Sequence, residues 1–244
     1  MSLLRNLYYG IFDNTKVTIK KPDPLNGYKW IMDKNYGRAY FKGYYEPALT
    51  KYITDTLTNE SCFLDIGAHA GYFSLLAASI AQNGKVIVFE PEVNNFEFIE
   101  KIKQLNKIEN WTLVNAAVGL ENGHLRFKKG QTSSTGLIDA EGDVIVNQVS
   151  LDNFFEKEGI QKIDLIKIDV EGYGGNVLTG GVKIINRFKP IILFEIHEGS
   201  NEFITAWNLF SENFIFYNFE TMQKIDNSDS EDYKFIIIKP KIIG

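Results

Sequence analysis

The chain carries two acids, Asp65 and Glu90, at positions where a nucleotide-like cofactor could be held. Asp65 opens the segment D-I-G-A-H-A-G, which contains Gly67 and Gly71 and lies between an apolar run and a helix-like run. A strand, a glycine-containing turn and a helix in that order let backbone N–H groups and a helix N-terminus approach a charged cofactor. Glu90 follows at a distance near the ~20 residues expected of an acid that hydrogen-bonds ribose hydroxyls.

The residues of this turn favour S-adenosylmethionine (SAM) over a dinucleotide as the cofactor. An acid placed two residues before the first glycine suits the cationic sulfonium and the free amino group of SAM. The dinucleotide fingerprint G-x-G-x-x-G would instead need glycine where the chain has His69 and Tyr72, and His69 would crowd a pyrophosphate. Binding of NAD, with oxidoreductase activity on the same type of sheet, is therefore a lower-ranked alternative.

A second set of polar residues follows two later apolar segments and could act on an acceptor. Lys167 and Asp169 end the segment I-D-L-I-K-I-D, and Glu195 and His197 end the segment I-I-L-F-E-I-H. Transfer of a methyl group needs in-line alignment, and a base within hydrogen-bond reach of a hydroxyl adds ~10²–10⁴-fold to the rate. We therefore expect the catalytic residues to be Asp169, His197, Lys167 and Glu195.

Each of these residues also has a structural interpretation. Asp169 could cap a following helix, and His197 could lie at a strand end facing solvent. Lys167 lies inside an apolar segment, where an unpaired charge is costly, so it should pair with Asp169 or Glu195. Asp169, Glu171 and Glu195 could also hold Mg²⁺ together with waters, so a divalent metal is left open but is not favoured.

The elements that would position these residues alternate between apolar strands and helices. Continuous apolar strands suit a sheet covered on both faces, and strand–helix alternation implies parallel strands with right-handed crossovers. The chain therefore predicts an α/β fold with a Rossmann-like, seven-stranded, mostly parallel sheet, helices on both faces and an antiparallel last strand. The expected strands are 62–66, 86–89, 112–116, 163–168, 191–196, 214–217 and 235–238, with helices at 48–57, 72–81 and 94–105.

Two further segments lie outside this alternation. We expect residues 1–45, which are rich in aromatic side chains, to form an N-terminal extension that covers the active site. Residues 120–149 break the rhythm and are interpreted as an inserted hairpin that carries a polar surface loop. The residues predicted to bind the acceptor are Ser133 and Ser134 in that loop, together with Glu171 and Tyr44.

Composition limits the partners and the location. The chain has 244 residues, 44% hydrophobic and 23% charged, as is normal for a globular protein with one sizeable core. Its net charge of −5 offers no basic field for nucleic acid or for an anionic membrane surface. The sequence has no apolar run of the ~18 residues that would span a membrane and no secretory layout at its start, so we expect a cytoplasmic protein. A homodimer is left open.

These segments together resemble the FkbM family of SAM-dependent methyltransferases over about residues 45–198. The marks of the resemblance are the segments Y-E-P, F-L-D-I-G-A-H-A-G-Y-F-S, V-F-E-P, N-A-A-V-G, V-S-L-D-N-F, I-D-L-I-K-I-D-V-E-G and L-F-E-I-H-E. The resemblance implies that residues 46–244 form a class I methyltransferase domain. It also implies O-methylation of a hydroxyl on a sugar, a glycan or a glycosylated small molecule.

The resemblance further implies a set of cofactor contacts. Glu46 would cover SAM from the N-terminal side, and the glycine turn and Glu90 would hold it from the strand ends. Small residues after the third strand would let the adenine ring lie against the backbone. The full set of predicted cofactor-binding residues is Glu46, Asp65, Gly67, Ala68, His69, Gly71, Tyr72, Phe73, Glu90, Pro91, Ala116, Ala117 and Asp169.

Two positions depart from the pattern of that family. His69 stands where the family often has asparagine, and it could either reach the methionine part of SAM or bond to backbone. Gly174 stands where an acid is common, so a group that binds metal or substrate in relatives would be missing. The sequence therefore also allows a non-catalytic binding module with this fold, and it does not identify the acceptor.

Overall fold

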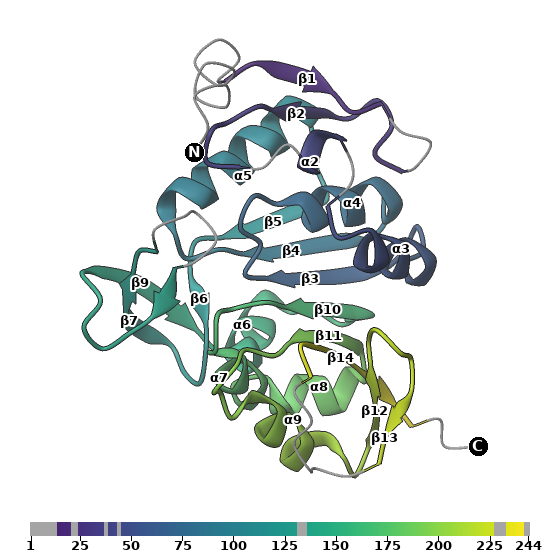
Figure 1. The fold of residues 1–244 in the computed structure, drawn as a ribbon, viewed down its shortest axis with the longest axis vertical. Coiled ribbons are helices and arrows are strands. Elements are labelled where there is room, and N and C mark those ends of the chain that lie inside the picture. The colour runs from purple at the N-terminus through teal and green to yellow at the C-terminus, as the bar shows by residue number, and fades with distance from the viewer. Residues whose placement is uncertain are drawn as a thin grey trace.

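The computed structural model describes residues 14–20, 24–36, 39–42, 45–130, 136–226 and 233–241. In these ranges the chain forms a mixed α/β fold built around one large sheet (Figure 1). The strands of this sheet, in chain order, are β3 (Cys62–Ile66), β4 (Lys85–Phe89), β5 (Trp111–Val114), β10 (Leu165–Ile168), β11 (Ile191–Glu195), β12 (Phe214–Asn218), β13 (Lys224–Ile225) and β14 (Phe235–Pro240).

The order of strands across the sheet is β13-β12-β14-β11-β10-β3-β4-β5. The five strands from β11 to β5 are parallel, and β14 runs antiparallel between β11 and β12. The predicted fold class is therefore confirmed, including the antiparallel last strand. The expected count of seven strands is corrected to eight, because Lys224–Ile225 pairs with β12 as β13. Two residues are too few to give a strand signal in the sequence.

Helices cover both faces of the sheet, and strand residues alternate between two apolar cores. Phe63 and Leu165 face the core that contains side chains of α3 (Pro47–Thr56), α4 (Tyr72–Ile80) and α5 (Val93–Asn106). Leu64 and Ile166 face the core that contains side chains of α6 (Leu151–Glu158), α7 (Gly174–Thr179), α8 (Val182–Phe188) and α9 (Glu202–Phe210). None of the helices in the described ranges is long and apolar enough to cross a membrane.

The segment before the sheet packs on α5, at the end of the molecule opposite β12 and β13 (Figure 1). It contains the antiparallel strands β1 (Lys16–Thr18) and β2 (Lys29–Ile31) and the short helix α2 (Ala39–Lys42). Trp30 is 1% exposed and lies edge-on to Phe98 of α5. Asn106 at the end of α5 closes the contact, because it exchanges two hydrogen bonds with the backbone of Lys29.

The insertion after β5 is larger than the predicted hairpin. The expected pair of strands is present as β7 (Gly123–Lys128) and β9 (Val144–Val149), which are antiparallel. Two short strands, β6 (Ala117–Val118) and β8 (Leu137–Ile138), extend it to a four-stranded sheet in the order β6-β9-β7-β8. This sheet projects beside the carboxyl ends of β3, β4 and β5, so it can form a wall of any site at that edge (Figure 1).

Candidate cofactor and active site

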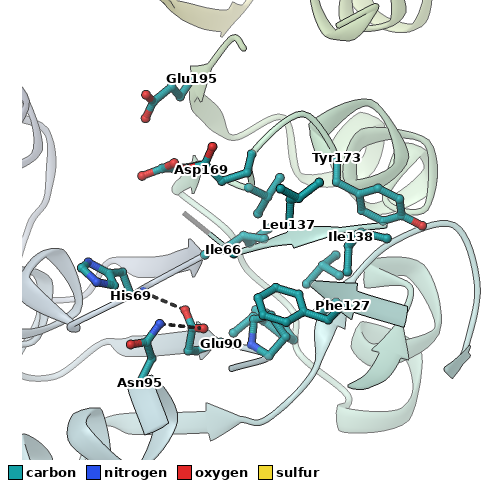
Figure 2. A pocket seen from close by; sticks show the side chains of 18 of the residues that line it. Ile66, His69, Glu90, Asn95, Phe127, Leu137, Ile138, Asp169, Tyr173 and Glu195 are labelled. Carbon is teal, nitrogen blue, oxygen red and sulfur yellow. Dashed lines mark hydrogen bonds between the residues drawn. The ribbon is translucent and has the colours of Figure 1, made fainter. Parts of the chain in front are cut away.

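A cavity of about 240 Å³ lies at the carboxyl ends of the central strands, where open α/β sheets bind their ligands (Figure 2). Figure 2 shows Asp169 and Glu195 on one side of this cavity and Glu90 with Asn95 on the other. The described residues that line it are Tyr45, Glu46, Ile66, Gly67, His69, Phe89, Glu90, Pro91, Asn95, Ala116, Ala117, Val118, Phe127, Gly136, Leu137, Ile138, Asp169, Val170, Glu171, Tyr173 and Glu195.

The turn after β3 is shaped by Gly67, which has a φ of +77°. A Cβ atom at this position would lie 1.9 Å from the backbone oxygen of Asp169, so a side chain cannot be accommodated there. The close approach brings the ends of β3 and β10 together at the cavity, and Asp169 donates its N–H to the carbonyl of Ile66. Asp169 does not cap a helix, because the next helix, α7, begins only at Gly174.

Glu90 is buried and is held by N–H donors. Its carboxylate accepts hydrogen bonds from the backbone of His69 at 2.8 Å and of Glu92 at 3.0 Å, and from the side chain of Asn95 at 3.4 Å. Burial raises the pKa of Glu90 to about 7, although these donors act in the opposite direction. Asn95, which no sequence motif indicated, becomes part of the site because α5 begins just after β4.

The N-terminal segment reaches two of these residues. The hydroxyl of Tyr36 donates to the side-chain oxygen of Asn95 at 2.8 Å, and the hydroxyl of Tyr40 lies 3.0 Å from Nδ1 of His69. His69 has a φ of +52°, and burial lowers the pKa of its ring to about 4, so the ring is neutral at physiological pH. Glu46 occupies the N-cap position of α3 in a left-handed conformation, without a side-chain capping bond, and lines the cavity beside Tyr45.

β10 contributes one charged residue, Lys167, which is buried and does not line the cavity. Its ammonium lies 3.2 Å from a carboxylate oxygen of Asp169 and 3.6 Å from Oδ1 of Asp65 on the neighbouring strand. Burial alone would lower the pKa of Lys167, but the carboxylates around it outweigh burial and raise that pKa. The prediction that Lys167 pairs with Asp169 is confirmed. Asp65 is fully buried, accepts a hydrogen bond from Ser74 and does not line the cavity.

Asp169 and Glu195 form a pair of carboxyl groups at the ends of adjacent strands, with oxygens within 4.8 Å of each other. Burial opposes ionisation of Asp169, but the neighbouring Lys167 ammonium holds its pKa below the usual value. Burial, followed by the negative charge of Asp169, raises the pKa of Glu195 to about 7. One member of the pair is therefore ionised while the other exchanges a proton near neutral pH, as a general base requires.

His197 lies behind this pair rather than in the cavity wall. Its Nδ1 atom is 3.3 Å from a carboxylate oxygen of Glu202, and its Nε2 atom is 3.7 Å from a carboxylate oxygen of Glu171. Glu202 is 2% exposed and also accepts the N–H of Gly174 at 2.7 Å. The sequence analysis did not single out Glu202, because only the packing of α9 against the strand ends brings it here.

Ligand atoms of Asp169, Glu195 and His197 lie within 4.8 Å of one another, which overlaps the set of acids considered for Mg²⁺. Asp169 is already paired with the ammonium of Lys167.

The remaining predicted residues fall into two groups. Ala68, Gly71, Tyr72 and Phe73 do not line the cavity, and the aromatic and alanine side chains among them pack in the core beneath the turn. Tyr44, Ser133 and Ser134 lie outside the described residues. The inserted sheet instead supplies apolar side chains that no motif indicated, namely those of Phe127, Leu137 and Ile138 (Figure 2).

Comparison with known proteins identifies the family. The chain matches the Methyltransferase FkbM domain over residues 65–235. It therefore belongs to this family of methyltransferases, as its motifs predicted, and membership implies SAM as the methyl donor.

Individual relatives are distant. The hexuronic acid methyltransferase AglP of Haloferax volcanii is 22% identical over 158 residues, which are 63% of this chain and 63% of the relative. The chain thus aligns with less than two thirds of that protein.

Two solved structures show the fold alone. Methyltransferase FkbM from Methylobacillus flagellatus KT has a TM-score of 0.54 at 13% identity, covering 75% of this chain and 44% of that one. A putative rRNA methylase from Clostridium thermocellum has a TM-score of 0.50 at 14% identity, covering 81% and 96%.

Proposed function

We propose that this FkbM-family protein is a SAM-dependent O-methyltransferase that acts on a hydroxyl of a sugar, a glycan or a glycosylated small molecule. The observation that carries the proposal is the arrangement of two different acid groups across one cavity. Glu90 lies among N–H donors on one side, and the Asp169–Glu195 pair lies on the other.

The first side fits the nucleoside part of SAM. Glu90 can accept hydrogen bonds from ribose hydroxyls, and Gly67 leaves room for the cofactor to approach the backbone. Phe127, Leu137 and Ile138 form an apolar wall with Ala117, which suits a flat adenine ring. When bound, SAM supplies an electrophilic methyl group on its sulfonium.

The second side fits the acceptor hydroxyl. Lys167 keeps Asp169 ionised, so this carboxylate can hold the hydroxyl by accepting a hydrogen bond from it. Glu195, with a pKa of about 7, can then take the hydroxyl proton as the C–O bond to the methyl group forms and the C–S bond breaks. The products are the methyl ether, S-adenosylhomocysteine and a protonated Glu195.

The sugar class is supported by one relative, which is named as a hexuronic acid methyltransferase. Neighbouring carboxylates that accept hydrogen bonds are also suited to a polyhydroxylated acceptor, because each hydroxyl can donate to one of them. Asp169, Glu171 and Glu195 lie together at this part of the cavity.

The test is transfer of labelled methyl groups from SAM to a fractionated extract of the host. We expect label in a saccharide or glycoside fraction, stable to mild base as a methyl ether is, and loss of that label with the Glu195→Gln variant. Label in nucleic acid or protein would contradict the proposed acceptor. Bound SAM without label in any fraction would contradict the enzymatic role and favour a binding module.

A further inference from the structure

Glu202 is a buried acid that takes no part in the cavity wall. It begins α9 and is 2% exposed. Its carboxylate accepts the backbone N–H of His197 at 2.8 Å, the backbone N–H of Gly174 at 2.7 Å and the hydroxyl of Ser200 at 2.9 Å. This number of donors favours the ionised form of a buried carboxylate.

These donors decide the charge of Glu202. Burial alone would raise the pKa of its carboxyl, but the hydrogen bonds from His197, Gly174 and Ser200 outweigh burial and hold that pKa below the usual value. An ionised carboxylate can only accept hydrogen bonds. The Nδ1 atom of His197, 3.3 Å away, must therefore carry a proton if the two groups are bonded.

Gly174 makes room for this arrangement. A Cβ atom at position 174 would lie 2.2 Å from the Phe194 ring and 2.8 Å from Oε1 of Glu202, the oxygen that accepts the Gly174 N–H. An acid at this position, as the family resemblance leads one to expect, would displace the Glu202 carboxylate. In this chain a carboxylate from α9 thus occupies the space beside the Gly174 backbone.

The other ring nitrogen of His197 faces the cavity carboxylates. Nε2 is 3.7 Å from a carboxylate oxygen of Glu171, which lines the cavity, and one of the two ring nitrogens lies within 4.8 Å of oxygens of Asp169 and Glu195. Burial lowers the pKa of His197, but the carboxylates of Glu202, Glu195 and Glu171 outweigh burial and raise it. Above that pKa the ring is neutral, and Glu171 and Glu202 compete for its single proton. Glu202 is closer and far less exposed, at 2% against 38% for the Glu171 side chain, so its hydrogen bond should be the stronger.

We propose that Glu202 is a positioning residue that holds the His197 ring through Nδ1–H, so that the unprotonated Nε2 faces the carboxyl groups of the cavity. The role rests on the proposed function in one respect only. Methylation of a hydroxyl releases one proton per turnover, and an Nε2 lone pair beside Glu171, which lines the cavity, gives that proton a route towards solvent.

The experiment is imidazole ¹⁵N NMR of the full-length protein without cofactor, at a pH where His197 is neutral. The chain has only three histidines, so His69→Gln, His124→Gln and His197→Gln variants assign the signals. We expect the neutral His197 ring to carry its proton on Nδ1 in the parent protein. A ring with its proton on Nε2 would overturn the proposal without any further variant.

Two matched isosteric variants sharpen the result. Glu202→Gln should shift the His197 tautomer towards Nε2–H and lower kcat by about tenfold or more with little change in KM. Glu171→Gln should leave the proton on Nδ1. A shift with Glu171→Gln and none with Glu202→Gln would overturn the assignment. Gly174→Ala, which crowds the same carboxylate, should act in the direction of Glu202→Gln if the latter does not fold.

The two proposals fail separately. An Nδ1–H ring in a protein that transfers no methyl group would leave the positioning role and remove the enzymatic one. Methyl transfer by a protein whose neutral His197 carries its proton on Nε2 would support the enzymatic role and contradict the positioning role of Glu202.

Discussion

Two groups of acids face the same cavity, and the protein stabilises them by different means. Glu90, at the end of β4, is held by N–H donors from His69, Glu92 and Asn95. Asp169, at the end of β10, is held by the ammonium of Lys167 at 3.2 Å. Glu90 is 5% exposed and the Asp169 side chain 27%, so the two acids differ both in what stabilises them and in how far they are buried.

Because the two acids are stabilised differently, one cavity can separate cofactor binding from chemistry. A carboxylate among fixed N–H groups offers further lone pairs to hydroxyl donors, which suits recognition of a ribose. Burial, and then the negative charge of the neighbouring Asp169 carboxylate, raise the pKa of Glu195 to about 7. The first group should therefore control cofactor affinity, and the second should control turnover.

The largest expected effect is on turnover in Glu195→Gln. Loss of a general base should lower kcat by ~10²–10⁴-fold, while the dissociation constant of SAM stays within about twofold of the parent value. Steady-state kinetics and calorimetric titration with SAM measure the two quantities. Glu198→Gln, an exposed position close by in the sequence, is the control and should leave both unchanged. A loss of SAM affinity equal to the loss of turnover would break the division of roles.

The next effect is on stability in Lys167→Met. Removing the ammonium leaves Asp65 and Asp169 without their buried cation, which should lower the free energy of unfolding by ~3–5 kcal/mol. Lys51→Met is the matched control, because its pair with Asp55 is exposed and should contribute only about 0–1 kcal/mol. Urea unfolding measures both. Equal effects in the two variants would show that the cluster beneath the cavity is not held by Lys167.

A smaller effect is expected on cofactor affinity in Glu90→Ala. Loss of charge-assisted hydrogen bonds to ribose should weaken SAM binding by about 1.5–3 kcal/mol, roughly 10- to 150-fold. Glu97→Ala, on the solvent-exposed side of α5, should leave SAM affinity unchanged. Parent-like affinity in Glu90→Ala would remove Glu90 from the cofactor site.

The pH dependence of kcat should show which acid acts in the chemical step. Because Glu195 must be deprotonated to act as a base and its pKa is raised to about 7, kcat should fall about tenfold per pH unit below that value and level off above it. The Glu195→Gln variant should not show this fall in kcat at low pH. A kcat that is flat between about pH 6 and 8 in the parent protein would contradict the assignment.

The smallest effect is expected in Tyr36→Phe, which removes one hydrogen bond to Asn95 while keeping the ring. Asn95 would then hold Glu90 less firmly, and SAM binding should weaken by ~0.5–1.5 kcal/mol. The same titration measures it. A loss as large as that of Glu90→Ala would mean that the N-terminal segment contacts the cofactor more directly than through Asn95.

Local sequence patterns were enough for the framework of the fold. The apolar run at 62–66, the glycine turn after it and the acid after the next strand each depend on neighbouring residues, and β3 has the predicted bounds. The parallel order then follows from the alternation of strands and helices. The helices α6, α8 and α9 were not placed, and α7 was expected only as a helix somewhere after Asp169, without bounds. Of these, α7 begins with two glycines, which weaken a helix signal.

The contacts that complete the site come from distant parts of the chain. Glu202 meets His197 only because α9 packs at the end of β11, and Asn95 meets Tyr36 only because the N-terminal segment folds over α5. Leu137 and Ile138 reach the cavity through the pairing of β8 with β7. Such contacts depend on tertiary packing, so no spacing rule within one segment could indicate them.

The most direct test of the account is to measure the dissociation constant of SAM and kcat side by side for the parent protein, Glu90→Ala and Glu195→Gln. We expect Glu90→Ala to raise the dissociation constant of SAM by roughly tenfold or more and to change kcat less than Glu195→Gln does. We expect Glu195→Gln to lower kcat by about 10²-fold or more while its affinity for SAM stays close to that of the parent protein. Variants that change the same quantity, or none, would contradict the division between cofactor binding at Glu90 and chemistry at the Asp169–Glu195 pair.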